Sequence, residues 1–489
     1  MYRKEKQQET TAEKFDLSKE SKLASDNRWV IMEKMIPWSE FEAEYAAMFS
    51  SEIGAPAKPF RMALGALIIK EKLGTSDRET VEQIRENPYL QYFIGMSGYS
   101  NEVPFDPSML VHFRERINID LVNKVNREMV KKTLEIAGEE VKEKKYVLDE
   151  EIIEPKNRGK LILDATCAPA DISYPTDLGL LNQARTQTEK IIDVLYEPLK
   201  EKLEKKPRTY RNLARKDYLE VSKKRRPSLI QRKQAIKKQL QYIKRNLSHI
   251  DQLIELGANL SSLSNKQYKI LLVIVEIYRQ QLWLYENKKI SIEDRIVSLT
   301  QPHIRPIVRG KAGKSTEFGA KLSASCFGGY VFLTHLSWDN FNESGDLKAQ
   351  VEDFKTYTGH YPESVHVDKI YRTKDNRAWC QERGIRISGP PLGRPPKNVS
   401  KEKKKQALED ERIRNCIEGK FGQGKRRFSL GRVMAKLSHT SQTAIAITFL
   451  VMNLVTRLSQ IFSGFLCQFL KGTSFFSSLI IKTYIAVFA

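Results

Sequence analysis

Apolar residues recur at helical spacing through the first third of the chain. From Pro59 the run "PFRMALGALIIKEKL" places them three or four positions apart, which is typical of an amphipathic helix. A second such run, "FDPSMLVHFRERI", starts with Asp106 as N-cap and Pro107 at the first helical position. The pattern predicts a domain of short helices and tight turns over residues 56–150. Residues 1–55 are expected to be a charged leader with one short helix.

The hydrophobic period changes at "KLILDAT", residues 160–166. A short apolar run that ends in an aspartate is typical of a buried strand. Further strand-like runs begin at "IRPIVRG", "SVHVDKI" and "IRISGPP", and Gly328 with Gly329 is suited to a hairpin turn. Helical segments separate these strands, so we expect a mixed α/β domain over residues 160–457.

A long helical stretch interrupts the expected sheet at about residues 178–300. The apolar residues of its middle part follow a heptad-like pattern: Leu229, Ile236, Leu240, Ile243, Leu247, Ile250 and Ile254. We interpret the stretch as a helical hairpin inserted into the α/β domain. Its charged faces either point to solvent or clamp DNA. A later helix is expected to begin near Lys401, to carry Glu418 and to run towards a break at "FGQGKRRF".

The net charge of the chain indicates what class of molecule it binds. The 489 residues carry a formal net charge of +22, and the basic residues are clustered. Such an excess attracts polyanions, because each Lys or Arg that meets a phosphate releases condensed counterions. Nucleic acid is therefore the expected partner, and a merely basic, soluble surface is the alternative. Arg114 and Arg116, at the end of a predicted short helix, either face DNA or are solvated residues of an ordinary bundle.

The cysteines and the two terminal segments indicate the cellular compartment in which the protein is expected. The five cysteines are far apart and form no C-x-x-C pair, which argues against a zinc ribbon or a disulfide scaffold and fits a reducing cytoplasm. Residues 1–20 lack the apolar core of a signal peptide. Residues 458–489 form an apolar tail in which Lys471 and Lys482 leave pieces too short to span a bilayer. A buried or dimer-packing helix is expected there, with membrane association as the alternative.

Three carboxylates occupy positions that suit metal-dependent phosphodiester chemistry. Asp164 ends the first strand, Asp368 ends a later one, and Glu418 lies on the helix that begins near Lys401. Two divalent ions about 4 Å apart activate the attacking hydroxyl and steady the leaving oxygen in such reactions, and Mg²⁺ needs little more than a few carboxylates. Taken singly, each residue is also explained as a strand terminus, a cap or a solvated helix residue.

The surroundings of these carboxylates resemble the three catalytic blocks of DDE transposases from bacterial insertion sequences. The blocks are "LILDATCAPADISYPTDLGLLNQAR", "VHVDKIYRTKDNRAWCQERGIRISGPPLGRPPK" and "RNCIEGKFGQGKRRFSLGRVMAKL", and insertion sequence family five is the most similar group. The third block follows Y-x2-R-x3-E-x6-K with Arg414, Glu418 and Lys425 in place, whereas Glu411 stands at the tyrosine position. "PFRMALGALIIKEKLG" and "FDPSMLVHFRERI" resemble the family's N-terminal helical domain.

The resemblance implies a ribonuclease-H-like catalytic core, interrupted by the helical insertion and preceded by an all-α DNA-binding domain. It implies Asp164, Asp368 and Glu418 as catalytic residues and ligands of two Mg²⁺ or Mn²⁺ ions. The implied partners are double-stranded DNA, as terminal inverted repeats and target, and further copies of the chain in a dimer or larger assembly. A cytoplasmic, nucleoid-associated enzyme is expected. The expected DNA contacts are Arg414, Lys425, Lys369 and Arg372, with Lys420 among the unspecific phosphate contacts.

Two other functions fit part of the pattern. A non-catalytic DNA-binding protein derived from a transposase would use the same basic surface and helical domain. A structure-selective nuclease would use the same carboxylates to cut DNA without joining it. The joining of strands separates a transposase from both alternatives.

Overall fold

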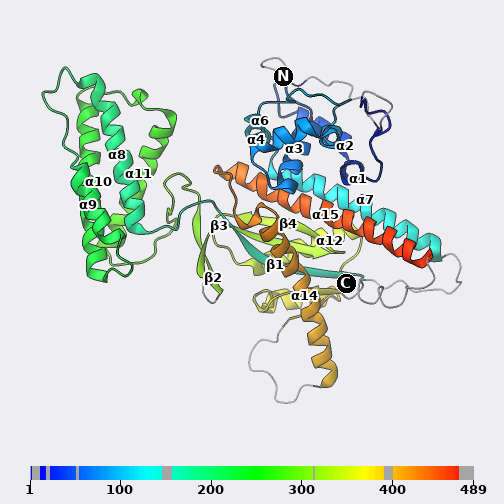
Figure 1. The fold of residues 1–489 in the computed structure, drawn as a ribbon. Helices are drawn as coiled ribbons and strands as arrows, with labels where there is room; N and C mark the ends of the chain where they lie inside the picture. Colours follow the sequence, from blue (N-terminus) through cyan, green and yellow to red (C-terminus); the bar gives the residue numbers. More distant parts are fainter. Residues whose placement is uncertain are drawn as a thin grey trace. The chain divides into compact units, whose positions relative to one another are not determined.

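A computed structural model describes residue 2 and residues 11–17, 22–50, 54, 56–145, 157–311, 314–389 and 400–472. The last part of the apolar tail, with Lys482, lies outside the described residues. The chain divides into two compact units (Figure 1). The first comprises Met1–Ala168, Lys321–Leu336 and Phe341–Ala489, and the second comprises Pro169–Ala320 and Ser337–Asn340.

Seven helices form the N-terminal part of the first unit. They share an aromatic and aliphatic core in which Phe60, Leu64 and Ile68 are fully buried. A left-handed Gly74 ends α3, and the Ser76 side chain caps α4. The helices are α1 (Arg28–Met35), α2 (Trp38–Ala46), α3 (Phe60–Leu73), α4 (Asp77–Glu86), α5 (Pro88–Phe93), α6 (Met109–Arg116) and α7 (Ile119–Lys145).

The predicted leader differs from the structure. Residues 28–46 form two helices rather than one, and Trp29, Met32 and Tyr45 are buried in the unit's interior. Phe15, upstream of both helices, is buried with them. These helices are short, so their apolar residues do not repeat often enough to produce a periodic signal.

A mixed sheet forms the centre of the α/β part. Its strand order is β2-β3-β1-β5-β6, and β4 pairs with β3. β1, β5 and β6 are parallel, with Ile162 opposite His366 and Val365 opposite Ile387. β3 and β4 form the predicted hairpin, since Gly328 and Gly329 both have positive φ, as a type I′ turn requires. The strands are β1 (Lys160–Pro169), β2 (Arg305–Lys311), β3 (Lys314–Phe327), β4 (Tyr330–Ser337), β5 (Ser364–His366) and β6 (Arg386–Ile387).

The helix expected near Lys401 is α14 (Lys401–Arg427), which continues through Gly422 and Gly424 and ends inside the "FGQGKRRF" segment where its end was predicted. Gly424 lets α14 approach its neighbours closely, because a Cβ there would meet the Leu430 and Met452 side chains at 3.0 Å. The glycine therefore serves packing rather than termination. Other helical segments of this part are η3 (Glu343–Asp346), α12 (Leu347–Thr358), η4 (Lys369–Tyr371), α13 (Lys374–Glu382), η5 (Ser429–Gly431) and α15 (Ser438–Gly472).

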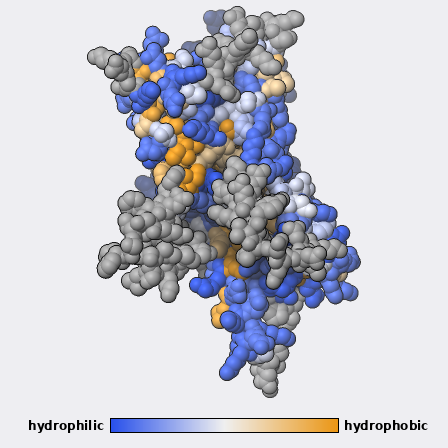
Figure 2. Space-filling model, turned by 90° about the vertical axis from the view of Figure 1, so that its right-hand side faces the viewer, coloured by the Kyte–Doolittle hydropathy of each residue, from blue (hydrophilic) through white to orange (hydrophobic). Residues whose placement is uncertain are grey.

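Helix α15 is the most apolar helix of the first unit. Over Ser438–Gly464 its length and composition would suffice to cross a membrane, but 61% of its most apolar window is buried inside the protein. It packs against α3, α6, α7 and α14. The described surface seen in Figure 2 is mostly hydrophilic, with hydrophobic side chains confined to smaller areas. Burial against neighbouring helices accounts for the composition of residues 438–458, as expected of a core helix.

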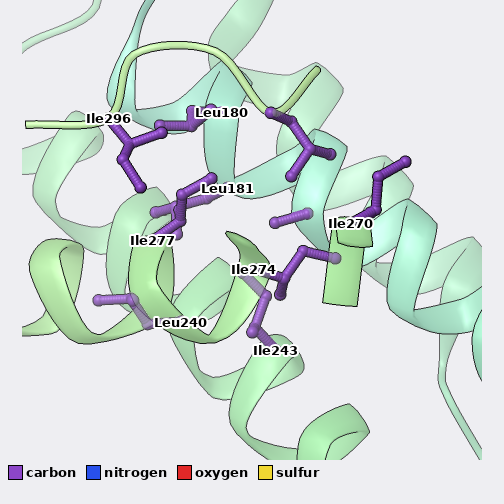
Figure 3. Packing of buried hydrophobic residues seen from close by; sticks show 10 residues of the cluster. Leu180, Leu181, Leu240, Ile243, Ile270, Ile274, Ile277 and Ile296 are labelled. Carbon is purple, nitrogen blue, oxygen red and sulfur yellow. The ribbon is translucent and has the colours of Figure 1, made fainter. Parts of the chain in front are cut away.

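The second unit contains four helices rather than the hairpin that the sequence suggested. α8, α10 and α11 share a hydrophobic core (Figure 3), and α9 packs on α8 and α10. Leu240, Ile243 and Ile250 of the heptad-like pattern are buried, whereas Leu229 is 76% exposed. The segments are α8 (Asp177–Tyr196), η1 (Glu197–Leu199), α9 (Arg211–Ser222), α10 (Leu229–Glu255), η2 (Leu260–Ser262) and α11 (Asn265–Glu286).

Candidate active site

Asp164 lies in the middle of β1, and Asp368 follows the neighbouring parallel strand β5. The prediction that Asp164 ends its strand is therefore wrong, because β1 continues to Pro169. The register pairs Ile162 of β1 with His366 of β5, and each aspartate follows two residues later. Adjacent strands are about 4.8 Å apart, so the two carboxylates emerge side by side. Asp368 lies just beyond β5, is exposed, and caps η4 by accepting a hydrogen bond of 2.6 Å from the Lys369 N–H.

Asp164 sits in an environment that opposes its negative charge. Burial raises the pKa of its carboxyl to about 6, against the lowering effects of a hydrogen bond from the Ala165 N–H, at 2.8 Å, and of the Arg414 charge. The charges of Glu418 and Asp368 raise the pKa further. Arg414, Glu418 and Asp368 therefore each act electrostatically on Asp164.

The position of Glu418 depends on how α14 is anchored. Near its middle, Asp410 forms a two-point ion pair with Arg386 of β6, at 2.8 and 2.9 Å. Further along, Ile417 and Phe421 are buried, and Lys420 donates a hydrogen bond of 2.7 Å to Thr456 of α15. These contacts fix α14 beside the sheet and leave the Glu418 side chain 52% exposed.

Arg414 bridges two glutamates on α14. Its guanidinium donates to Glu418 and to Glu411, each at 2.8 Å, one turn away on either side. The two glutamates have equal side-chain exposure, and the Glu418 charge is among those that raise the pKa of Asp164. The hydrogen bonds to Glu411 and Glu418 raise the pKa of Arg414 above its usual value. Arg414 therefore remains a cation beside the candidate carboxylates.

The carboxylates fit a divalent metal site by donor chemistry. Asp164, Asp368 and Glu418 offer the hard oxygen ligands that Mg²⁺ prefers, and the charges of Asp368 and Glu418 act on Asp164. In the arrangement described here Glu418 binds Arg414 instead of joining the two aspartates. Accordingly, within the described part of the chain no three His, Cys, Asp or Glu side chains stand together as a metal-binding group.

The predicted DNA-contacting cations near the site occupy different environments. Lys369 is exposed beside Asp368, and Lys425 is half-buried on α14. Arg372 donates to the Gly389 carbonyl oxygen, and burial lowers its pKa. Lys420 is bound to Thr456, and burial also lowers its pKa. The structure thus leaves Lys369 most accessible and directs Lys420 into the protein.

The two arginines of α6 lie among the N-terminal helices, and the ion pair and the ring contact that they form are with residues of that part of the chain rather than with the candidate carboxylates. Arg114 forms a two-point ion pair with Asp77 of α4, at 2.7 and 3.1 Å, and its side chain is only 12% exposed. Arg116 is exposed, with its guanidinium carbon 4.4 Å from the centre of the Phe49 ring. Arg114 therefore joins two helices, whereas Arg116 presents its charge at the surface.

Two family models match the chain, both of them transposase domains. Residues 365–455, which include Asp368, Arg414, Glu418 and Lys425, match "Transposase DDE domain". Residues 17–116 match "Transposase domain (DUF772)". Both matches are consistent with a DDE transposase of insertion sequences. The DDE-domain match begins after Asp164, so that residue is connected to the site by the β1–β5 register rather than by the match.

One curated protein is similar to part of the chain. The chain is 30% identical over 150 residues to "Uncharacterized protein ORF8 in nfe locus" from Rhizobium meliloti. The match covers 31% of the chain and 65% of the relative, so it spans just under two thirds of that protein. No solved structure matches the chain.

Two buried residues of the DDE-domain segment escaped the sequence analysis. Tyr371 is fully buried beneath the site, and burial together with the Asp164 charge raises the pKa of its hydroxyl well above the usual value. His366 contacts the Ser364 and Ser388 hydroxyls at 3.0 and 3.3 Å, and burial lowers its pKa to about 4. Both residues lie in the segment "SVHVDKIY" close to Asp368, and this position was the sequence signal that could have indicated a role near the site.

Proposed function

We propose that this chain is a DNA transposase that binds the terminal repeats of an insertion sequence, cleaves DNA strands there and joins them to a target. Asp164, Asp368 and Glu418 are the proposed catalytic residues and metal ligands. The proposal includes a ribonuclease-H-like core around the mixed sheet, interrupted by the second unit, and an insertion sequence of family five. Both transposase-domain matches support this function over a non-catalytic DNA-binding protein.

The observation that carries the proposal is the electrostatic coupling of the three carboxylates. The charges of Glu418 and Asp368 act on Asp164 although the three residues are far apart in the sequence. Glu418 lies on α14, Asp368 follows β5, and Asp164 lies in β1. A fold has little reason to bring three acidic groups together against burial and mutual repulsion, unless a cation or a reaction uses them. DDE transposases generally use divalent metals, and these oxygen donors suit Mg²⁺ or Mn²⁺.

The protein side chains and the metals would divide the work as follows. Two bound divalent ions would activate the attacking hydroxyl and stabilise the leaving oxygen. Asp164 and Asp368 hold their ligand atoms on rigid parallel strands, which fixes the geometry of the site. Arg414 and Lys425 supply positive charge for the phosphates of the bound strand, and exposed Lys369 adds a contact beside Asp368. Positioning and charge stabilisation are the proposed source of catalysis.

The proposed setting follows from the same chemistry. Helices α1–α7 are the proposed DNA-binding domain, with Arg116 as an exposed phosphate contact and Arg114 as its structural neighbour. Two element ends must be held together during transposition, so we propose a dimer or larger assembly on double-stranded DNA. The proposed location is the cytoplasm, on the nucleoid.

The direct test is a strand-cleavage and strand-transfer assay on end DNA of the element that encodes the chain. Wild type and Asp368→Ala are compared with Mg²⁺, with Mn²⁺ and with EDTA. We expect joined products from wild type only with metal, and none from the variant, although both proteins bind the end DNA. Cleavage without joining would support a nuclease instead, and binding without any product would support the non-catalytic alternative.

A further inference from the structure

Most of the chain's excess positive charge is concentrated in one stretch of the second unit. Residues 205–245 contain 16 Lys and Arg but only two acidic residues, a net +14 out of +22. Residues 246–300 of the same unit contain six basic and six acidic residues. Solubility alone does not require this asymmetry. Charge concentrated on α9 and the first half of α10 marks that part of the unit as a surface for a polyanion.

The structure leaves this charge at the surface. All the Lys and Arg of residues 205–245 are exposed except Arg245, which is half-buried. Among them, the ion pairs found in the described residues are those of Lys206 and Arg211 with Asp193 and of Lys238 with Asp217. The four consecutive cations of the turn between α9 and α10 have no carboxylate partner in the described part of the chain: Lys223, Lys224, Arg225 and Arg226.

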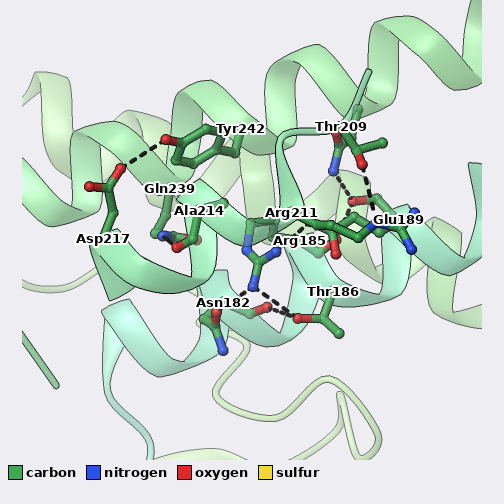
Figure 4. Close-up of polar contacts among 12 residues, drawn as sticks. Asn182, Arg185, Thr186, Glu189, Thr209, Arg211, Ala214, Asp217, Gln239 and Tyr242 are labelled. Atoms are coloured by element: carbon green, nitrogen blue, oxygen red, sulfur yellow. Dashed lines mark hydrogen bonds and ion pairs between the residues drawn. The ribbon is translucent and has the colours of Figure 1, made fainter. Parts of the chain in front are cut away.

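Two acidic residues on α9 precede this turn: Glu220 is exposed, and Asp217 is used for internal packing. Asp217 accepts a hydrogen bond of 2.8 Å from the Tyr242 hydroxyl, and Gln239 donates one of 3.0 Å to the Ala214 carbonyl oxygen (Figure 4). These bonds hold α9 on α10. Asp217 therefore neutralises little of the turn, and the two helices present the four cations on a fixed support.

Two large apolar side chains follow the four cations. Leu229 and Ile230, at the start of α10, are 76% and 69% exposed. Ser228 and Gln231 form a capping box that fixes the helix start at this point. Exposed aliphatic side chains next to a cluster of cations suit a partner whose surface carries negative charge and also offers apolar atoms. The grooves of duplex DNA provide both, and minor-groove proteins insert Leu and Ile there.

We propose that residues 223–230, which we name the basic tip, bind duplex DNA independently of its sequence. Lys223, Lys224, Arg225 and Arg226 contact phosphates, and Leu229 with Ile230 lies against the groove between them. Charge complementarity selects this partner, because duplex DNA carries about one negative charge per 1.7 Å of its axis. The proposal rests on the proposed function for its partner, but it requires neither the carboxylates nor a metal ion.

The test measures binding of the full chain to a duplex of arbitrary sequence in EDTA, by fluorescence anisotropy at several salt concentrations. One variant replaces Lys223, Lys224, Arg225 and Arg226 by Gln. Its control replaces Lys266, Lys269, Lys288 and Lys289 by Gln, four exposed lysines of the same unit without a carboxylate partner among the described residues. Both variants remove the same charge from the same unit.

We expect the tip variant to bind roughly 10- to 100-fold more weakly near 0.1 M salt, with the slope of log affinity against log salt reduced by about 0.9 per lost phosphate contact. The control should change both quantities far less. A double variant, Leu229→Ser with Ile230→Ser, should weaken binding without changing the slope.

Equal losses in the tip variant and the control would overturn the proposal, as would an unchanged tip variant. Loss of binding to phosphatidylserine vesicles, with DNA binding intact, would assign the tip to a membrane instead. Wild type that binds no duplex at all would contradict the proposed function itself.

Discussion

At the scale of single residues, Asp164 shows the conflict on which the proposed site depends. A metal ligand must be ionised, yet burial and two neighbouring carboxylates raise the pKa of Asp164 to about 6. The folded protein without metal therefore holds a carboxylate that is easier to ionise in the unfolded chain. Binding of a cation would relieve this cost, which explains how a destabilising group serves a function.

Replacing Asp164 by Asn should stabilise the metal-free protein in a pH-dependent way. Because the folded-state pKa is raised, the folded state binds a proton more tightly than the unfolded state between about pH 4 and 6. The wild type consequently loses stability as the pH rises through this window. In EDTA, the Tm of Asp164→Asn should exceed that of wild type most above pH 7, and the difference should shrink as the pH falls below 6.

The control for this experiment is Asp26→Asn, which changes an exposed carboxylate of the same unit. Its Tm should follow that of wild type across the same pH series. A lower Tm for Asp164→Asn at pH 7.5, or a difference that does not vary with pH, would contradict the electrostatic description of the site.

Individual residues differed in how well the sequence predicted their surroundings. Asp368 follows its strand as predicted, whereas Asp164 lies in the middle of β1, and the pairing of Ile162 with His366 brings the two aspartates to the same level of the sheet. Arg114 and Lys420 were predicted as DNA contacts, but the fold provides Arg114 with Asp77 and Lys420 with Thr456. Sequence spacing does not reveal which cation finds an internal partner, since those partners are 37 and 36 residues away.

At the scale of elements, Glu71 connects helix α3 to the C-terminal segments of the first unit. Its buried carboxylate accepts hydrogen bonds from the Ser429 N–H and hydroxyl at 2.8 to 2.9 Å, and from the Thr448 hydroxyl at 2.7 Å. α3, η5 and α15 thus meet at one polar point inside an apolar interface. This point ties the N-terminal helices to the helix that packs against α14.

Replacing Glu71 by Ala should destabilise the first unit. The change removes the acceptor of the part-buried Ser429 N–H, at a cost of about 1–3 kcal/mol for an unsatisfied group, and the Ser429 and Thr448 hydroxyls lose their bonds to the carboxylate. Thermal unfolding followed by circular dichroism would measure the effect. Glu86→Ala, at an exposed position on α4, should change the Tm little. Equal Tm values for both variants would contradict the role of Glu71.

The elements themselves were predicted best where their periodicity was strong. The first strand and the glycine hairpin at Gly328 and Gly329 are confirmed, because a buried apolar run and a two-glycine turn are local signals. Two features were wrong: the single N-terminal helix and the inserted helical hairpin, which has four helices among the described residues. Burial of short helices depends on distant segments, which no local pattern reports.

At the scale of the whole molecule, charge and carboxylates occupy different units. The candidate active site belongs entirely to the first unit, whereas residues 205–245 of the second unit hold a net +14. Because these features are separate in the chain, variants can address them independently. Loss of the basic tip should weaken DNA binding, and loss of a carboxylate should stop chemistry on DNA that remains bound.

Whether Glu418 is the third catalytic carboxylate is tested by comparing Glu418→Gln with Glu411→Gln in the strand-joining assay. Both glutamates lie on α14, bind Arg414 at 2.8 Å and have equally exposed side chains. Removing a residue that only supports a metal ligand typically costs 10- to 100-fold, so Glu418→Gln should lower the joining rate by more than about 100-fold. Glu411→Gln should retain activity close to wild type. An inactive Glu411→Gln beside an active Glu418→Gln would contradict the assignment of the third carboxylate, and with it this account of the site.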